Sequence, residues 1–219
     1  MIVTKFAAAL LLAYLVGAIP VGLMVGRLVR GVDVREYGSG KIGATNVLRT
    51  AGVGAGTAVL VGDVLKGVLA VILAGLIMGG GRFYVGGIEV GARLAQGLAL
   101  LAAVVGHNWP VYVRFKGGRG TAVLAGGGLV LAWWATLICV FIFGLVIYVS
   151  RWVSLGSISG AFCGIVLLII LAFFGLRPWE YAISIALSSA LVIGAHWDNI
   201  VRLVQGKERK LGQRAERRT

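Results

Sequence analysis

Long apolar segments separated by short polar stretches fill most of this sequence, and they constrain its fold more than any other feature. The longest runs from Thr121 to Val149 without one charged residue. Hydrophobic residues make up 59% of the 219 residues, which is too apolar for a soluble domain. Apolar segments of about 20 residues match the length of helices that cross a lipid bilayer. The sequence therefore predicts an all-α polytopic integral membrane protein.

A seven-helix transmembrane bundle is expected, as one domain over residues 1–219. Its approximate spans are 3–26, 53–80, 90–109, 121–133, 134–150, 155–176 and 180–196. The run from Thr121 to Val149 decides the count, because as one helix it would be about 44 Å long and a single crossing would invert everything after it. Two short spans return the chain to the first side and put Trp133 and Trp134 at the opposite interface, where aromatic residues gather. Five spans, with some segments re-entrant or interfacial, are the alternative.

The distribution of basic residues predicts the orientation of the bundle. Five Lys and Arg residues lie in 27–49, three in 114–119 and seven from Arg202 onward, whereas the loops between these segments hold few. Because cytoplasmic loops of membrane proteins are enriched in Lys and Arg, we expect the N-terminus outside and the C-terminus in the cytoplasm. The net charge of +13 favours membrane lipid and anionic substrates as partners. Nucleic acid is not expected, because the basic residues lie in short loops between spans.

A glycine-rich, basic stretch from Glu36 to Ala51, EYGSGKIGATNVLRTA, interrupts the apolar segments. Glycines let the backbone approach a ligand closely, successive backbone N–H groups can form an anion-binding nest, and the fork of Arg49 suits phosphate oxygens. The candidate ligand-binding residues here are Gly38, Ser39, Gly40, Thr45, Asn46 and Arg49. They predict a phosphate cradle beside the membrane, with a flexible basic cytoplasmic loop as the alternative. The stretch is not a Walker A loop, because Ala44 and Thr45 follow Gly43.

A second glycine-rich basic segment follows the third expected span, where GHNWP at 106–110 leads to FKGGRG at 115–120. It combines backbone donors with two cations at the start of the next expected helix, where the helix dipole also favours an anion. A loop that merely obeys the positive-inside rule is the alternative. The candidate residues of this segment are Lys116, Gly117, Gly118 and Arg119.

Two shorter polar clusters flank the last expected spans. In RWVSLGS at 151–157, Ser154 precedes an apolar run, where a serine often caps a helix, and Ser157 follows it. In HWDNIVRL at 196–203, His196 and Asn199 are three residues apart and share one helix face. The expected topology places all four polar clusters at the cytoplasmic face. This convergence favours one shared site over four separate loops.

Two ionisable residues and two cysteines lie inside apolar segments. Asp63 and Lys66 share one helix face at membrane depth, where such residues usually pair and face the bundle interior. They favour a structural ion pair, with a role in orienting the site from behind as the alternative. Cys139 and Cys163 are expected as small core residues and not as a disulfide framework or a metal site. Neither a metal nor a cofactor is expected.

The four polar clusters resemble the signatures of one bacterial family, the acyl-phosphate:glycerol-3-phosphate acyltransferases of the PlsY type. GSGKIGATNVLR is similar to the first signature, GH-x-x-P with FKGGRG to the second, R-x-x-S-L-x-S to the third and H-W-x-N-I-x-R-L…G-x-E to the fourth. The chain departs from the family pattern at three positions, because Lys41 replaces the usual Asn, Arg119 the usual Lys and Trp197 the usual Arg. The motifs cover four well-separated regions and occur in the family's order.

The resemblance implies an acyltransferase of the bacterial cytoplasmic membrane that moves a fatty acyl group from acyl phosphate to the 1-hydroxyl of glycerol 3-phosphate. The products would be lysophosphatidic acid and phosphate, in the first acylation step of phospholipid synthesis. Catalytic roles are implied for Ser39, Arg49, Lys116, His196 and Asn199. Substrate-binding roles are implied for Gly38, Gly40, Thr45, Asn46, Gly117, Gly118, Arg119, Ser154 and Ser157.

The residues favour a mechanism without a covalent acyl-enzyme, because the sequence has neither a serine elbow nor an HxxxxD motif. Phosphate is a good leaving group, so positioning and oxyanion stabilisation can supply most of the catalysis. A substrate phosphate is expected to accept the hydroxyl proton while His196 donates a hydrogen bond to phosphate, with His196 as general base the alternative. We expect acyl phosphate against the 38–46 loop and the Gly117–Gly118 backbone, and glycerol 3-phosphate against Arg49, Lys116, His196 and Asn199.

Two other classes of protein also fit parts of the sequence. A transporter of organic phosphates could have seven spans, glycine-rich loops and an Asp/Lys pair in the membrane. It should also show an internal repeat and a site near the membrane midplane, and the sequence has no convincing repeat. A membrane scaffold whose basic loops bind anionic lipid is the other alternative.

Overall fold

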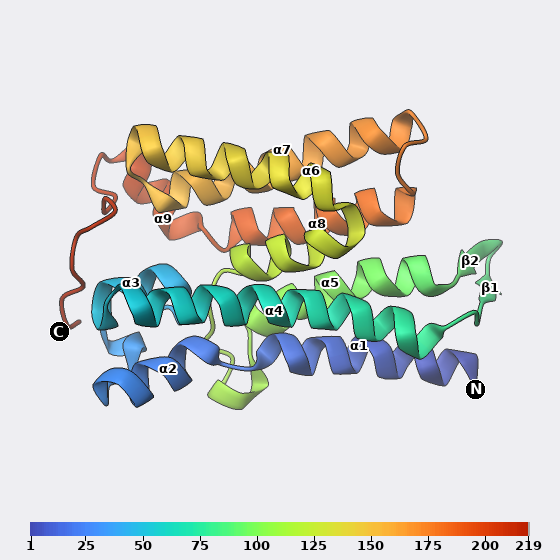
Figure 1. Cartoon of the computed structure of the whole chain (residues 1–219), viewed down its shortest axis with the longest axis horizontal. Coiled ribbons are helices and arrows are strands. Elements are labelled where there is room, and N and C mark those ends of the chain that lie inside the picture. Colours follow the sequence, from blue (N-terminus) through green and yellow to red (C-terminus); the bar gives the residue numbers. More distant parts are fainter. Residues whose placement is uncertain (219) are drawn as a thin grey trace.

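A computed structural model describes residues 1–218 as a bundle of helices that is longer than it is wide (Figure 1). Within these residues lie nine α-helices: α1 (Ile2–Ala18), α2 (Val21–Arg30), α3 (Ala44–Ala51), α4 (Val53–Met78), α5 (Ala92–Asn108), α6 (Thr121–Ser150), α7 (Val153–Phe173), α8 (Trp179–Gly194) and α9 (Trp197–Val204). There are also two 3-10 helices, η1 (Val34–Glu36) and η2 (Val111–Val113), and an antiparallel hairpin of β1 (Phe83–Val85) and β2 (Ile88–Val90). Apart from this short hairpin, the helical architecture expected from the sequence is confirmed.

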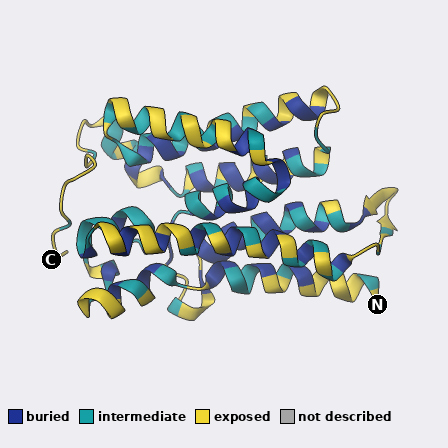
Figure 2. Cartoon of the chain, in the orientation of Figure 1, coloured by how far each residue is buried: buried dark blue, intermediate teal, exposed yellow. Residues whose placement is uncertain are grey.

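Four helical segments of the described chain are long and apolar enough to cross a membrane: Ile2–Arg30, Val53–Met78, Thr121–Ser150 and Val153–Phe173. Large apolar side chains are exposed along their outer faces, including those of Leu11, Leu76, Phe141, Phe162 and Phe173. Figure 2 shows exposed and buried residues alternating along the helices. Soluble proteins rarely expose so much contiguous apolar surface. These faces suit contact with lipid, as an integral membrane protein requires.

The first expected span, 3–26, is divided into two helices. α1 ends at Ala18 and α2 begins at Val21, with Ile19 and Pro20 between them. Proline has no N–H to continue the helical hydrogen bonds, and it disfavours the helical conformation in the residue before it. Ile19 accordingly has φ −55° and ψ 118°. The helix is therefore completely broken at Ile19 and Pro20, after which α2 extends to the left-hand end of the bundle (Figure 1).

The 30-residue helix α6 reverses its direction near its middle. Ala132 has φ −155° and ψ 69°, which are not helical values. In Figure 1 the first half of α6 runs toward the right and the second half returns to the left. Residues 128 and 136 would be about 12 Å apart along a straight helix, but a Cβ on Gly128 would lie 2.7 Å from Thr136 Oγ1. Thr121 and Arg151 therefore lie toward the same end of the molecule.

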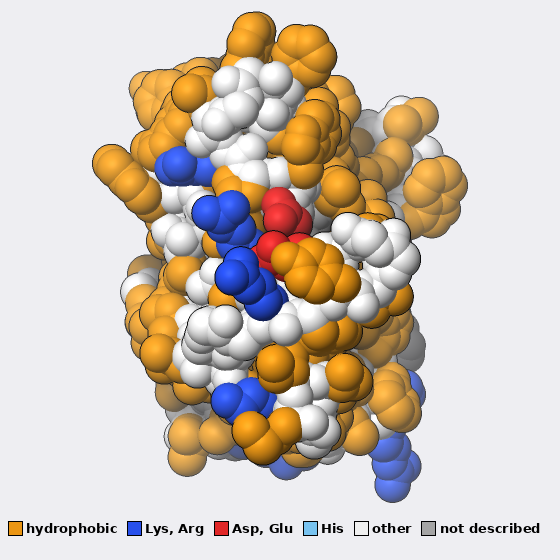
Figure 3. Space-filling model, turned by 90° about the vertical axis from the view of Figure 1, so that its right-hand side faces the viewer, with side chains coloured by type: hydrophobic (Ala, Val, Ile, Leu, Met, Phe, Trp, Pro, Cys, Tyr) orange, Lys and Arg blue, Asp and Glu red, His pale blue; other side chains and the backbone are white. Residues whose placement is uncertain are grey.

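The two ends of the bundle differ in polarity. The end that holds α2, α3, α9 and the last described residues, at the left of Figure 1, will be called the polar end. Residues 27–49 and 202–218 lie there and contain 12 of the 21 Lys and Arg residues. The opposite end carries the N-terminus and the β1–β2 hairpin. In Figure 3 this opposite end is mostly apolar or uncharged, with a small group of charged side chains.

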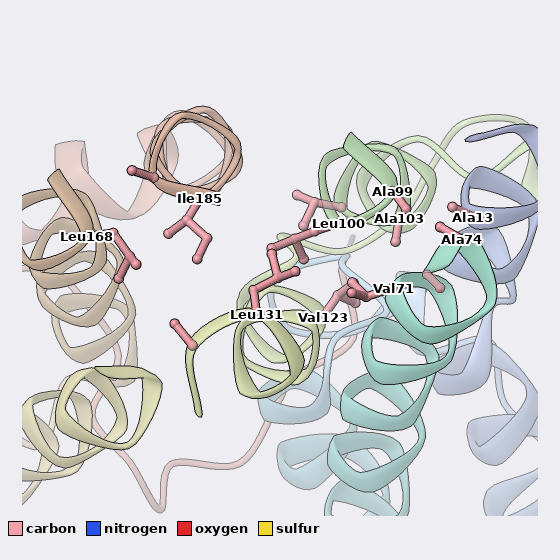
Figure 4. Packing of buried hydrophobic residues seen from close by; sticks show 14 of the residues in the cluster. Ala13, Val71, Ala74, Ala99, Leu100, Ala103, Val123, Leu131, Leu168 and Ile185 are labelled. Atoms are coloured by element: carbon pink, nitrogen blue, oxygen red, sulfur yellow. The ribbon is translucent and has the colours of Figure 1, made fainter. Parts of the chain in front are cut away.

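Small residues bring the helix backbones close together. Figure 4 shows Ala13 of α1, Ala74 of α4 and Ala99 of α5 in the buried cluster where these three helices meet. Small residues at helix contacts are the usual means of close packing in lipid, where the hydrophobic effect does not drive helices together. α4 and α6 cross in the same way, since a Cβ on Gly126 would overlap the carbonyl oxygen of Val64.

Replacing Gly126 by Ala should destabilise the protein, because the added methyl group forces α4 and α6 apart. We expect a loss of about 1–3 kcal/mol, as for other overpacked cores, and a lower melting temperature in detergent. Gly144 lies in the same helix, and no atom is within 4 Å of the place where its Cβ would lie. Gly144→Ala is thus the matched control and should not lower the melting temperature. Equal melting temperatures for the two variants would contradict the close α4–α6 crossing.

Candidate active site

The first glycine-rich segment folds around the side chain of Asn46, in the first turn of α3. The buried Nδ2 group donates to the carbonyl oxygens of Val34 (2.8 Å), Tyr37 (3.2 Å) and Lys41 (2.9 Å). The Oδ1 atom accepts a hydrogen bond from the N–H of Ser39 (3.0 Å). The loop thus occupies the whole amide, so Asn46 holds Ser39 in place. This differs from the direct contact with substrate that the sequence implies for Asn46.

The loop needs glycine at two positions. Gly38 and Gly40 have φ values of 54° and 68°, in the left-handed region that other residues rarely adopt. The two turns place Ser39 between them, on the wall of a cavity that Thr45 also lines. The first motif therefore contributes two hydroxyl groups to the cavity, held by a loop that is hydrogen-bonded to its own helix.

This cavity has a volume of about 450 Å³ and lies between the residues of the polar end and the helices α4, α6, α7 and α8. Its polar part is formed by the loop before α3, α3 itself, the segment before α6, and α9 with the residues that follow. Its apolar part is lined by side chains such as Leu60, Leu124, Phe143, Leu168 and Ile185. One continuous cavity therefore joins a cationic mouth to an apolar trench between helices.

All four sequence motifs contribute to this one cavity. The predicted site residues that line it are Ser39, Thr45, Asn46, Arg49, Arg119, Ser154, Ser157, His196 and Asn199. Segments that are 150 residues apart in the sequence therefore meet at one site, as the expected convergence of the polar clusters requires.

The remaining five predicted residues lie outside the described lining of the cavity. Gly38 and Gly40 shape the first loop, and the side chain of Lys116 is exposed to solvent. Gly117 and Gly118 are buried against α5, where the N–H of Gly118 donates to the carbonyl of His107 (3.0 Å). A Cβ on Gly118 would overlap the His107 ring. These two glycines keep the second loop close to α5, and of this motif Arg119 reaches the cavity.

Two arginines enter the polar part of the cavity. Arg49 donates from Nη2 to the carbonyl oxygens of Arg209 (3.1 Å) and Lys210 (3.3 Å), and its buried Nε has no acceptor within residues 1–218. Arg119 pairs through Nη2 with Asp198 Oδ2 (3.1 Å). Burial lowers the pKa of both guanidinium groups from its usual value. An anionic ligand stabilises a partly paired, desolvated cation of this kind.

A buried carboxylate, Glu208, connects the third and fourth motifs. Its Oε1 accepts from Ser154 Oγ (2.9 Å) and Asn199 Nδ2 (2.7 Å), and its Oε2 accepts from Arg202 Nε (2.8 Å). Burial by itself would raise the pKa of Glu208. The three hydrogen bonds stabilise the carboxylate and together have the larger effect, so the pKa is lower than its usual value. Ser157 instead donates to a carbonyl of its own helix (3.0 Å). Glu208 is not among the residues predicted for the site, and its only sequence signal is the Glu of G-x-E.

His196 lies just after α8 and presents its Nε2 as an acceptor. Its Nδ1 is 2.7 Å from the carbonyl oxygen of Val192, and because a carbonyl only accepts, Nδ1 carries the proton. Burial lowers the pKa of His196 to about 4, so the ring is neutral near pH 7. In this tautomer Nε2 accepts a hydrogen bond and does not donate one to phosphate as expected from the sequence. Asn199 Oδ1 is a second buried acceptor without a donor in the described chain.

The two ionisable residues inside α4 pair with each other and with a third residue. Lys66 Nζ lies 2.9 Å from Asp63 Oδ1 and 2.8 Å from His107 Nδ1, and it donates to the carbonyl oxygen of Ile19 (3.1 Å). All three side chains are buried, and Asp63 and His107 line the cavity. The group forms the wall behind the site, and His107, which belongs to the GHNWP segment of the second motif, is not among the predicted site residues.

The lowered pKa of His196 should make stability depend on pH. Between pH 6.5 and about 4 the unfolded chain binds a proton at this residue and the folded chain does not. The free energy of unfolding should therefore fall as the pH falls through this window, by up to about 1.4 kcal/mol per pH unit. His196→Asn removes the group, so its unfolding free energy should decline less steeply than that of the parent. Denaturation in detergent at several pH values measures both slopes, and parallel curves would contradict the assignment.

The chain is similar to proteins of known function along almost its whole length. The family model described as glycerol-3-phosphate acyltransferase matches residues 7–206. Glycerol-3-phosphate acyltransferase 3 of Dehalococcoides mccartyi is 42% identical, and the match covers 98% of this chain and 100% of the relative. Glycerol-3-phosphate acyltransferase 2 of Moorella thermoacetica is 44% identical, and the match covers 94% of this chain and 98% of the relative. The crystal structure of PlsY (YgiH), an integral membrane glycerol 3-phosphate acyltransferase, in its glycerol 3-phosphate form has a TM-score of 0.80 at 31% identity, covering 94% of this chain and 96% of that one. The chain therefore belongs to the glycerol-3-phosphate acyltransferase family, of the PlsY type.

Proposed function

We propose that this acyltransferase moves a fatty acyl group from acyl phosphate to the 1-hydroxyl of glycerol 3-phosphate inside the cavity described above. The observation that carries the proposal is the continuity of the cavity, from a polar part with Arg49 and Arg119 to an apolar trench. One substrate is a water-soluble dianion and the other has a long acyl chain, so their reaction needs a site that is polar in one part and apolar in another. The structures of the relative PlsY are a glycerol 3-phosphate form and a lysophosphatidic acid form, which correspond to one substrate and one product.

The two substrates occupy different parts of the cavity in this proposal. Glycerol 3-phosphate lies against Arg49, His196 and Asn199, where a cation and two acceptors can bind its phosphate and its hydroxyl groups. The phosphate of acyl phosphate lies near Ser39, Thr45 and Arg119, and its acyl chain extends along the trench. Lys116 lies outside the cavity lining and contributes to the positive field at its mouth.

The proposed reaction needs no covalent intermediate on the protein. The 1-hydroxyl oxygen attacks the acyl carbonyl carbon, the ester C–O bond forms, and the C–O bond to phosphate breaks with its electron pair on the leaving phosphate. Nε2 of His196 and Oδ1 of Asn199 orient the hydroxyl. A group with a pKa of about 4 is too weak a base to keep the proton, so the proton passes to a substrate phosphate. Fixed cations and the Ser39 hydroxyl stabilise the charge that develops on the acyl oxygen.

The proposed topology has seven crossings, with the N-terminus outside and the polar end in the cytoplasm of a bacterium. Two observations support it. The reversal at Ala132 makes α6 two crossings, which brings the chain back to the polar end at Arg151. The concentration of Lys and Arg at that end agrees with the positive-inside rule. Water-soluble glycerol 3-phosphate would then reach the cavity from the cytoplasm.

A transporter of organic phosphates is not favoured. A transporter holds its ligand near the membrane midplane between two repeats, whereas the polar part of this cavity lies among the residues of the polar end. The family to which the chain belongs consists of acyltransferases. The same comparison gives no support to a membrane scaffold.

The function is tested by following phosphate release from purified protein in detergent. Palmitoyl phosphate should yield phosphate and lysophosphatidic acid when glycerol 3-phosphate is present, because the hydroxyl is the acyl acceptor. Palmitoyl-coenzyme A should not replace palmitoyl phosphate as the acyl donor, since the cavity mouth suits a small anionic head group. Equal turnover with palmitoyl-coenzyme A would contradict the choice of donor.

A pair of variants tests whether this cavity performs the reaction. Arg49→Lys keeps the charge but loses the planar fork, so kcat/KM should drop at least tenfold, which is about 1.4 kcal/mol. Arg30 is exposed at the end of α2 and does not line the cavity, so Arg30→Lys is the matched control and should behave as the parent. A parent-like Arg49→Lys would remove Arg49 from the proposed site.

The topology is tested with single cysteines in a protein whose own two cysteines are replaced by serine. Cysteines at Tyr84 and Trp133 should react with a membrane-impermeant maleimide added to intact cells. A cysteine at Lys116 should react only after the cells are opened, because it lies in the loop before α6 on the cytoplasmic side. Labelling of the position 133 cysteine only in opened cells would rule out two crossings by α6.

A further inference from the structure

The last described residues form an ordered segment that crosses the polar end. Residues 209–218 will be called the C-terminal strap, and in Figure 1 they are the dark red trace beyond α9. Backbone hydrogen bonds fasten the strap to the first motif, from the N–H of Gly38 to Glu216 O (2.9 Å), from Arg218 N–H to Glu36 O (2.7 Å) and from Ala215 N–H to Arg49 O (3.2 Å). The match to the family model ends at residue 206. The strap therefore lies beyond the residues that this family model describes.

The strap lines a second, open cavity at the mouth of the first one. This cavity has a volume of about 500 Å³ and is lined by Gly38, Ser39, Asp198, Arg202, Glu216 and three arginines of the strap, Arg209, Arg217 and Arg218. Ser39, Arg202 and Arg209 line both cavities. A ligand that moves from the second cavity past these three residues enters the first.

The charges around the second cavity favour an anion. Four guanidinium groups face two carboxylates, Asp198 and Glu216. Asp198 is already paired with Arg119 (3.1 Å) and lies 3.9 Å from Arg202. The guanidinium groups of Arg209 and Arg218 have no ion pair or hydrogen bond with a described residue.

The position of Arg218 depends on the first glycine-rich loop. A Cβ on Gly40 would overlap Nη1 of Arg218, so the absence of a side chain at residue 40 leaves room for this cation. Arg217 is held at the same loop by an ion pair with Glu36 (3.1 Å). The loop that places Ser39 in the active site thus also places two strap arginines at its entrance.

We propose that the second cavity is a capture site for the phosphate group of glycerol 3-phosphate, built from the strap and α9. The inference rests on the proposed function, because it assigns the capture site to the acceptor substrate of that reaction. Guanidinium groups bind phosphate monoesters through charge-assisted, paired hydrogen bonds. A charged mouth raises the rate of association of an oppositely charged ligand. Inorganic phosphate shares this chemistry and leaves the active site by the same route.

The capture site should affect the encounter with glycerol 3-phosphate and not the chemical step. Arg217→Gln with Arg218→Gln should lower kcat/KM for glycerol 3-phosphate by about threefold to tenfold, with kcat and the KM for acyl phosphate unchanged. The difference from the parent should shrink at high salt, because exposed charges are screened.

Two control proteins separate this site from other effects of the strap. Lys210→Gln with Arg214→Gln removes the same charge from the same segment, but these two residues are exposed and line neither cavity. Glu36→Gln removes the ion pair with Arg217 but keeps the charge of every strap arginine and the backbone hydrogen bonds that fasten the strap to the first motif. Both controls should keep the parent's kcat/KM.

Binding of inorganic phosphate, measured by calorimetry without acyl donor, tests the same site independently of turnover. The Arg217→Gln, Arg218→Gln protein should bind phosphate more weakly or at fewer sites than the parent and the two controls. The capture site would be overturned by any one of three results. These are unchanged binding and kinetics in the Arg217→Gln, Arg218→Gln protein, equal losses in the Lys210→Gln, Arg214→Gln control, and a fall in kcat. If the parent itself does not turn over acyl phosphate and glycerol 3-phosphate, the proposed function fails, while the calorimetry still decides whether the strap binds phosphate.

Discussion

The arrangement of the site depends on the contacts that the ammonium group of Lys66 makes with Ile19, Asp63 and His107. Pro20 ends α1 and leaves the Ile19 carbonyl at a break in the helix, and a break at membrane depth requires a protein donor in place of water. The N–H of Val21 donates to this carbonyl (3.0 Å), and Lys66 supplies the second donor (3.1 Å). Lys66 is itself balanced by Asp63, and it also donates to Nδ1 of His107. The His107 ring lies against Gly118, three residues before the first residue of α6. One buried cation thus fixes the break in α1, the end of α5 and the loop that leads to Arg119.

The polar end is organised by side chains that bind the protein's own backbone and not a ligand. The side-chain amide of Asn46 makes all of its hydrogen bonds, donated and accepted, with the backbone of residues 34–41. Glu208 accepts hydrogen bonds from three side chains and so joins α7, α9 and the start of the tail. These contacts leave the Ser39 hydroxyl, His196 Nε2 and Asn199 Oδ1 in fixed positions around the cavity. Fixed donors and acceptors are what a reaction without a covalent intermediate requires, because positioning then supplies most of the rate.

Hydropathy and motif order predict the helices and the grouping of the four motifs, because lipid leaves few alternatives to a helix and the motifs share one end. The directions of single side chains are a different matter. Asn46 points into its loop, Lys116 lies outside the cavity, and Nε2 of His196 is an acceptor because of a carbonyl on the preceding turn. Such directions depend on contacts between distant segments, for example between Arg49 and the carbonyl of Arg209, and local sequence patterns do not encode them.

The contacts of Arg49 connect the tail to the active site. Its Nη2 binds two carbonyl groups, those of Arg209 and Lys210, while its Nε has no acceptor in the described chain. A phosphate that binds the guanidinium group through two parallel hydrogen bonds competes with those carbonyls, and charge-assisted bonds to phosphate are the stronger ones. In the proposed site, binding of phosphate to Arg49 would therefore weaken the attachment of the tail, and by reciprocity a firmly attached tail would weaken the binding of phosphate. The backbone hydrogen bonds of residues 215–218 to Glu36, Gly38 and the Arg49 carbonyl do not involve the Arg49 guanidinium group. The tail can therefore release this guanidinium group and still stay at the mouth of the cavity.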